Sequence, residues 1–132
     1  MINPKKIAIK SEILSEINSL ENEYEIIKNF LKGTQYDLAQ IRAVLQSFKD
    51  SLSKVRSLVK AYFEMEGQKY DFQILPILQS VDLAYILMEA YATENIEQIR
   101  GILQLCLSMS NTKIEDVMSH ISTLKKTTFT ES

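Results

Sequence analysis

Residues 38–62, LAQIRAVLQSFKDSLSKVRSLVKAY, place a hydrophobic residue at alternating steps of three and four. The repeat consists of Leu38, Ile41, Leu45, Phe48, Leu52, Val55, Val59 and Tyr62. Such steps bring hydrophobic side chains onto one side of an α-helix, whereas a β-strand would need strict alternation. Held over the whole stretch, this spacing is typical of a helix that packs lengthwise against another helix. We therefore expect a helix over residues 35–66.

A second repeat of the same kind precedes this stretch and supplies the partner helix. Its members are Ile13, Ile17, Leu20, Tyr24, Ile27 and Leu31. Asn3 and Pro4 mark its start, because asparagine caps helices and proline suits the first helical position. Gly33 marks its end, since glycine tolerates the left-handed backbone that closes many helices. Helices over residues 4–32 and 35–66, joined by so short a turn, must run antiparallel. We predict a long N-terminal helical hairpin.

The remainder of the chain predicts shorter helices. They are expected over residues 72–93, 96–109 and 113–126, with a frayed tail at 127–132. The first of them is hydrophobic almost all round, which predicts the most buried helix of the fold. Gly101 lowers the stability of the second by about 1 kcal/mol relative to alanine, so we expect close packing against a neighbour. No linker interrupts the chain. We predict an all-α, single-domain helical bundle of four to five helices, residues 1–132, built on the hairpin.

Few side chains suited to catalysis or metal binding are present. With one cysteine and one histidine, no zinc site of Cys and His ligands can form within one chain. Cys106 lies between two leucines, which predicts a buried thiol with a raised pKa and low reactivity. His120 is expected to be an exposed helical histidine, with a pH-sensing or ligand role as the alternative. The three glycines are too far apart for a phosphate-binding loop. We expect no enzymatic activity, no cofactor and no metal.

The overall composition fits an ordinary globular protein in a reducing compartment. Hydrophobic residues make up 45% and charged residues 24%, and the net charge is −2. No apolar run is long enough to cross a bilayer, and the first residues lack the apolar core of a signal peptide. A single cysteine excludes an intramolecular disulfide. We expect a cytoplasmic protein that does not enter a membrane.

The hydrophobic stripe of the hairpin is wider than a two-helix coil needs. Val44 and Leu58 widen it on the second helix, so the hairpin must bury a further flank against the rest of the chain or against another copy. Tyr62, Phe63 and Met65 cluster at its open end, and such residues are enriched in interfaces. The alternative is that they fill the corner where two helices meet. These five residues are the candidate protein interface.

A row of cations follows one flank of the same stripe. Arg42, Lys49 and Arg56 recur every seven residues, and Lys60 lies one turn beyond Arg56. Such a row can follow a phosphate backbone. The alternative is a row beside the acidic first helix, of which only Glu21 falls on the matching flank. These four cations are the candidate nucleic-acid contacts, although the net charge of −2 disfavours that partner.

Three classes of function remain open, of which a pocket inside the bundle for a small apolar ligand has no identifiable polar anchor. The favoured hypothesis is a non-enzymatic helical protein–protein interaction module, such as an assembly subunit, adaptor, chaperone or small inhibitor, that self-associates through the hairpin. The alternative is a small helical accessory subunit that contacts nucleic acid through the row of cations.

Overall fold

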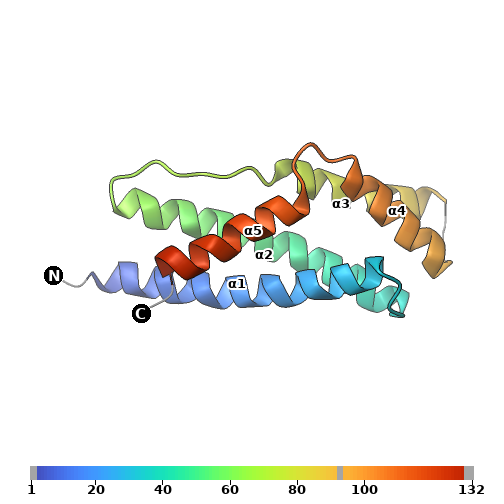
Figure 1. The fold of residues 1–132 in the computed structure, drawn as a ribbon, viewed down its shortest axis with the longest axis horizontal. Coiled ribbons are helices and arrows are strands. Elements are labelled where there is room, and N and C mark those ends of the chain that lie inside the picture. The colour runs from blue at the N-terminus through green and yellow to red at the C-terminus, as the bar shows by residue number, and fades with distance from the viewer. Residues whose placement is uncertain (1–2, 92–93, 130–132) are drawn as a thin grey trace.

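The fold is an all-α bundle, seen in a computed structural model that describes residues 3–91 and 94–129 (Figure 1). The elements are α1 (Pro4–Leu31), α2 (Leu38–Met65), α3 (Leu75–Ala90), α4 (Ile96–Ser108), α5 (Ile114–Leu124) and a turn of π-helix, η1 (Lys125–Phe129). The described residues contain no strand. The predicted all-α class and the N-terminal hairpin are confirmed.

The hairpin forms where the two repeats predict it. The hydrophobic repeat of α2 is buried from Ile41 to Tyr62, and that of α1 faces it. The Asn3 side chain caps α1, and Gly33 closes it with φ +111°. The second helix begins later than predicted, because the Asp37 carboxylate accepts the N–H of Gln40 at 2.8 Å and fixes the cap there. Its last helical residue is Met65.

The third helix is shorter than the predicted range of residues 72–93, of which residues 92 and 93 lie outside the described part. The chain runs without helical structure over residues 66–74. Within this segment the Asp71 carboxylate binds the Arg56 guanidinium of α2, which holds the backbone along that helix. Helix α3 therefore begins only at Leu75.

Helix α3 is also not the most buried helix, contrary to the prediction. Leu83 and Ile86 are exposed on its outer side. Its hydrophobic residues surround the whole helix, but α2, α4 and the core cover only part of that circumference. Because hydrophobic residues surround α3 on all sides, its sequence could not show which side would be exposed to solvent.

The C-terminal tail is more ordered than predicted. Lys125–Phe129 continue α5 as a π-helix, and the Phe129 ring is fully buried. It packs edge-on against Tyr62 with ring centroids 5.0 Å apart, while Lys125 binds Glu21 of α1 at 2.8 Å. The expected fraying of residues 127–129 is therefore wrong, and residues 130–132 lie outside the described part. An isolated aromatic residue carries no periodic signal that could have predicted this anchor.

The two ends of the hairpin carry different neighbours. Helix α5 runs obliquely over the hairpin, while α3 and α4 form an antiparallel pair at the end that holds the α1–α2 turn (Figure 1). Arg100 of α4 attaches the α3–α4 pair to this end of the hairpin. Its Nε donates to the Phe30 carbonyl oxygen at 2.6 Å, and its Nη2 donates to the Thr34 carbonyl oxygen at 3.3 Å. One hydrophobic core runs through all of these elements.

Candidate interaction surfaces

The candidate interface residues of the hairpin lie mainly against the protein's own chain. Tyr62 is buried, and Phe63 stacks on Tyr70 with ring centroids 4.5 Å apart. Val44 and Leu58 are partly buried and pack on the core. Met65, 37% exposed, is the most open of the five. Segment 66–74, α3, α5 and η1 thus cover much of the additional flank that the sequence left without a partner.

The row of cations on α2 faces acidic residues of segment 66–74 and α3. The three pairs are Arg42–Glu89, Lys49–Asp82 and Arg56–Asp71. The last is bidentate, with Nε–Oδ1 at 2.9 Å and Nη2–Oδ2 at 2.7 Å. Beside this row the Tyr85 hydroxyl donates to the carbonyl oxygen of Arg42. The cations therefore attach α3 and the preceding segment to α2, whereas the sequence had suggested the glutamates of α1 as partners.

Electrostatics at Asp71 reflect this attachment. Hydrogen bonds from Arg56, and a further one from the N–H of Phe72, hold the pKa of the Asp71 carboxyl below its usual range. The carboxyl is thus ionised, and it offsets the charge of Arg56 toward any anion that approaches.

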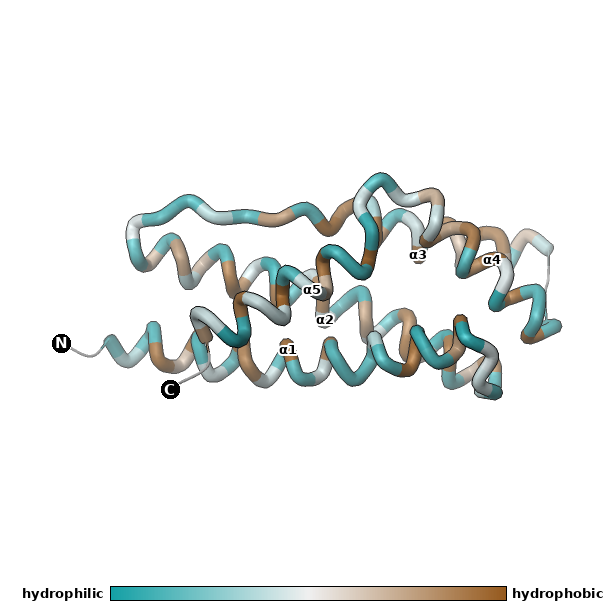
Figure 2. The backbone as a smooth tube through the Cα atoms, in the orientation of Figure 1, coloured by the Kyte–Doolittle hydropathy of each residue, from teal (hydrophilic) through white to brown (hydrophobic). Residues whose placement is uncertain are grey.

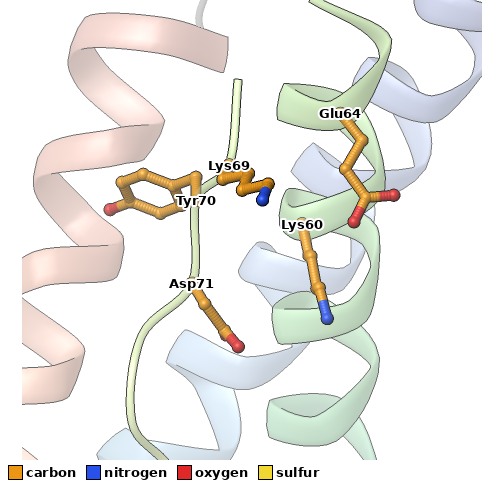
Figure 3. Close-up of a pocket in the computed structure, with 5 residues that line it drawn as sticks. All are labelled: Lys60, Glu64, Lys69, Tyr70 and Asp71. Atoms are coloured by element: carbon orange, nitrogen blue, oxygen red, sulfur yellow. The ribbon is translucent and has the colours of Figure 1, made fainter. Parts of the chain in front are cut away.

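Lys60, the fourth cation, borders a cleft of about 390 Å³ (Figure 3). Lys69 and Asp71 of the extended segment and Glu64 of α2 form its other charged walls. In Figure 3 the Tyr70 ring points away from Lys60, toward α5, where its hydroxyl makes a hydrogen bond with Nε2 of His120. Because the Asp71 carboxylate is paired with Arg56, Glu64 alone is left to offset Lys60 and Lys69, and the cleft keeps a small positive charge.

Exposed large hydrophobic side chains gather on α3 and α4 and on the residues directly after each helix. Leu75 at the start of α3 is exposed as well, but it lies beside α2 and segment 66–74. We call Leu83, Ile86, Tyr91, Ile102, Leu105 and Met109 the α3–α4 face. All but the partly buried Ile102 are between 40% and 73% exposed. Leu83 and Ile86 are one turn apart on α3, as are Leu105 and Met109 at the end of α4. Figure 2 shows the hydrophobic colour along much of these two helices. Side chains of this size rarely gather on an open surface without a partner.

A groove crosses this face where the end of α3 meets α4. It has a volume of about 520 Å³ and is lined by Tyr91, Gln98, Gly101, Ile102 and Leu105. Gly101 is exposed, and a Cβ atom added there would meet nothing within 4 Å. The expectation that Gly101 packs closely against a neighbour in the chain is therefore wrong. Its missing side chain instead leaves open space in the groove.

The side chains that could act as nucleophiles or as acids and bases lie apart from one another and form no cluster. Burial raises the pKa of the Cys106 thiol, and desolvation raises that of the Glu23 carboxyl between the hairpin helices. His120 stacks on Tyr70 and lies near Phe72, so its ring sits among aromatic side chains. Residues 3–91 and 94–129 contain no group of three or more acidic, His or Cys side chains that could hold a metal ion.

Within the described ranges, every helix is too short or too polar to span a bilayer. No known family, curated protein or solved structure matches this chain, so its function has to be inferred from its own surfaces.

Proposed function

We propose that this protein is a non-enzymatic helical interaction module that docks a helical surface of another protein chain on its α3–α4 face. The observation that carries the proposal is the exposure of five large hydrophobic side chains on two adjacent helices. The exposed parts of these side chains amount to roughly 600 Å², at the upper end of the largest patches found on monomers. Covering them with another protein surface removes this area from water, which favours association.

The chemistry of the face defines the occupant. No member of the face is charged, and the groove beside Gly101 is bordered by Tyr91 and Leu105. Such a groove suits an amphipathic helix whose hydrophobic residues recur every three to four positions, because the ridge of one helix fits a groove on another. The polar Gln98 at the groove offers an amide for orientation.

The remaining parts of the proposal follow from the other surfaces. We place docking on the α3–α4 face rather than on the hairpin because Tyr62 and Phe63 already pack within the chain. Nucleic-acid binding stays the alternative proposal, and it would require Arg42, Lys49 and Arg56 to leave their acidic partners. Burial raises the pKa of the Cys106 thiol, which argues against Cys106 as a catalytic nucleophile.

Oxidation footprinting tests the docking surface in the unmodified protein. Met109 lies on the face and is 66% exposed, whereas Met65 lies at the end of α2 and is 37% exposed. We expect Met109 to oxidise several-fold more slowly in the cells that make the protein than in dilute purified protein, while the rate of Met65 stays unchanged. An equal rate for Met109 in both settings would refute the proposed function.

A further inference from the structure

We infer that the occupant of the α3–α4 face is the same face of a second copy of this chain, with α4 crossing its symmetry mate near Gly101. The inference rests on the proposed function, and it adds the identity of the partner and the point of contact. It follows from the charge, the area and the backbone of the face.

The charge distribution permits the face to meet itself. A two-fold symmetric interface brings each residue type close to its own copy, so a charged patch would repel itself. The six residues of the face carry no charge, and the acidic residues of α3 and α4 are paired within the chain: Asp82 with Lys49, Glu89 with Arg42, and Glu97, one turn before Gly101, with Arg100. The Gln98 amide holds both a donor and an acceptor, so it can pair with an identical amide across the axis.

The area and the helix arrangement also suit a second copy. Stable interfaces bury about 800 Å² on each partner, with the low end near 600 Å², the amount that this face exposes. Two antiparallel helix pairs placed face to face form a four-helix arrangement with a shared hydrophobic interior. Neither copy then needs a change in its own fold, because α3 and α4 are already paired.

Gly101 supplies the point of closest approach. It lies in the middle of α4, where glycine weakens a helix, and no atom of the chain occupies the space beside it. Where two helices cross, a residue without a side chain lets the backbones come together, and on a two-fold axis the same residue is met from both sides. The glycine that has no packing role inside one chain thus acquires one between two chains.

Disulfide trapping tests the crossing point. Gly101→Cys places a thiol at the proposed contact, and Gln104→Cys places one at another exposed position of the same helix as the matched control. Two cysteines can be bridged only when their Cα atoms lie within about 7 Å. Because a Cβ at position 101 meets nothing within 4 Å, we expect the variant to fold, which its circular dichroism spectrum would verify. The unmodified chain, with its buried Cys106, gives the background.

Under mild oxidation, we expect Gly101→Cys to form a covalent dimer about ten-fold faster than Gln104→Cys, as a high local concentration of the two thiols implies. Equal rates for the two variants, or no dimer from either, would overturn the inference. If Met109 is nevertheless protected in cells, the partner is a different protein, and the proposed function stands without this inference.

Discussion

Arg100 provides the most informative test of how the α3–α4 pair is held. Its guanidinium is buried, donates to the carbonyl oxygens of Phe30 and Thr34, and lies 4.8 Å from the centroid of the Phe30 ring. It also binds Glu97 one turn earlier on α4. The Arg100→Ala substitution removes all these contacts at once and leaves hydrophobic packing alone to hold α4 at the end of α1.

The expected loss of stability can be worked from these contacts. Hydrogen bonds from a charged donor contribute about 1.5–3 kcal/mol, and a desolvated cation–π contact adds about 1–2 kcal/mol. The Phe30 oxygen keeps a second donor, the N–H of Gly33 at 3.0 Å, so it is not left unsatisfied. The Glu97 carboxylate is largely exposed, so its loss matters little. Because the bond to Thr34 is long at 3.3 Å, we count the short bond to Phe30 and the ring contact, and expect Arg100→Ala to lower the free energy of unfolding by about 3–5 kcal/mol.

Urea denaturation followed by circular dichroism measures this change. Arg100→Lys keeps the charge but loses the planar fork that reaches two carbonyls, so about half of the loss should remain. Glu97→Gln removes only the exposed ion pair and should change the free energy of unfolding by less than about 1 kcal/mol. A loss below about 1 kcal/mol for Arg100→Ala would refute the reasoning that Arg100 anchors α4.

Further predictions concern the tail, an ion pair and the thiol. Phe129→Ala should lower the free energy of unfolding by about 3–4 kcal/mol, because it empties a fully buried site beside Tyr62; a small loss in urea denaturation would show that η1 is not anchored. The lowered pKa of Asp71 stabilises the fold above the usual aspartate pKa, and this contribution is lost as the pH falls through the lowered value. Arg56→Gln should therefore reduce the decrease in the free energy of unfolding between neutral and acidic pH, as measured by urea denaturation at several pH values. An unchanged decrease would contradict the pairing of Arg56 with Asp71. Cys106 should react slowly with a thiol reagent in the native protein and rapidly in urea, and fast native labelling would contradict its burial.

Local signals made the hairpin predictable. The three-and-four spacing on α1 and α2 identifies the buried sides of both helices, and Asn3, Pro4 and Gly33 mark ends that depend only on nearby backbone. The start of α2 lies later than predicted because the Asp37 and Gln40 side chains form a capping box there. Features of this kind are encoded within one or two helical turns.

Long-range contacts account for what the sequence could not predict. The partners of Arg42, Lys49 and Arg56 lie 15 to 47 residues away in the chain, so no spacing rule connects them. The hydrophobic residues of α3 surround the helix, and only the placement of α2 and α4 decides that Ile86 stays exposed. We expected Gly101 to pack closely against a neighbour, but a Cβ added there would meet nothing within 4 Å. A glycine within a helical pattern does not show whether any atom of the same chain lies beside it.

Solution mass, measured by light scattering across a size-exclusion peak, tests self-association through the α3–α4 face most directly. The measurement compares the unmodified chain with Leu105→Asp on the face and Ile7→Asp, an equally exposed hydrophobic position on α1. At high concentration, the unmodified chain and Ile7→Asp should show twice the 15.2 kDa of one chain, and Leu105→Asp should show 15.2 kDa. A mass of 15.2 kDa for all three proteins, or a doubled mass for Leu105→Asp, would contradict the account.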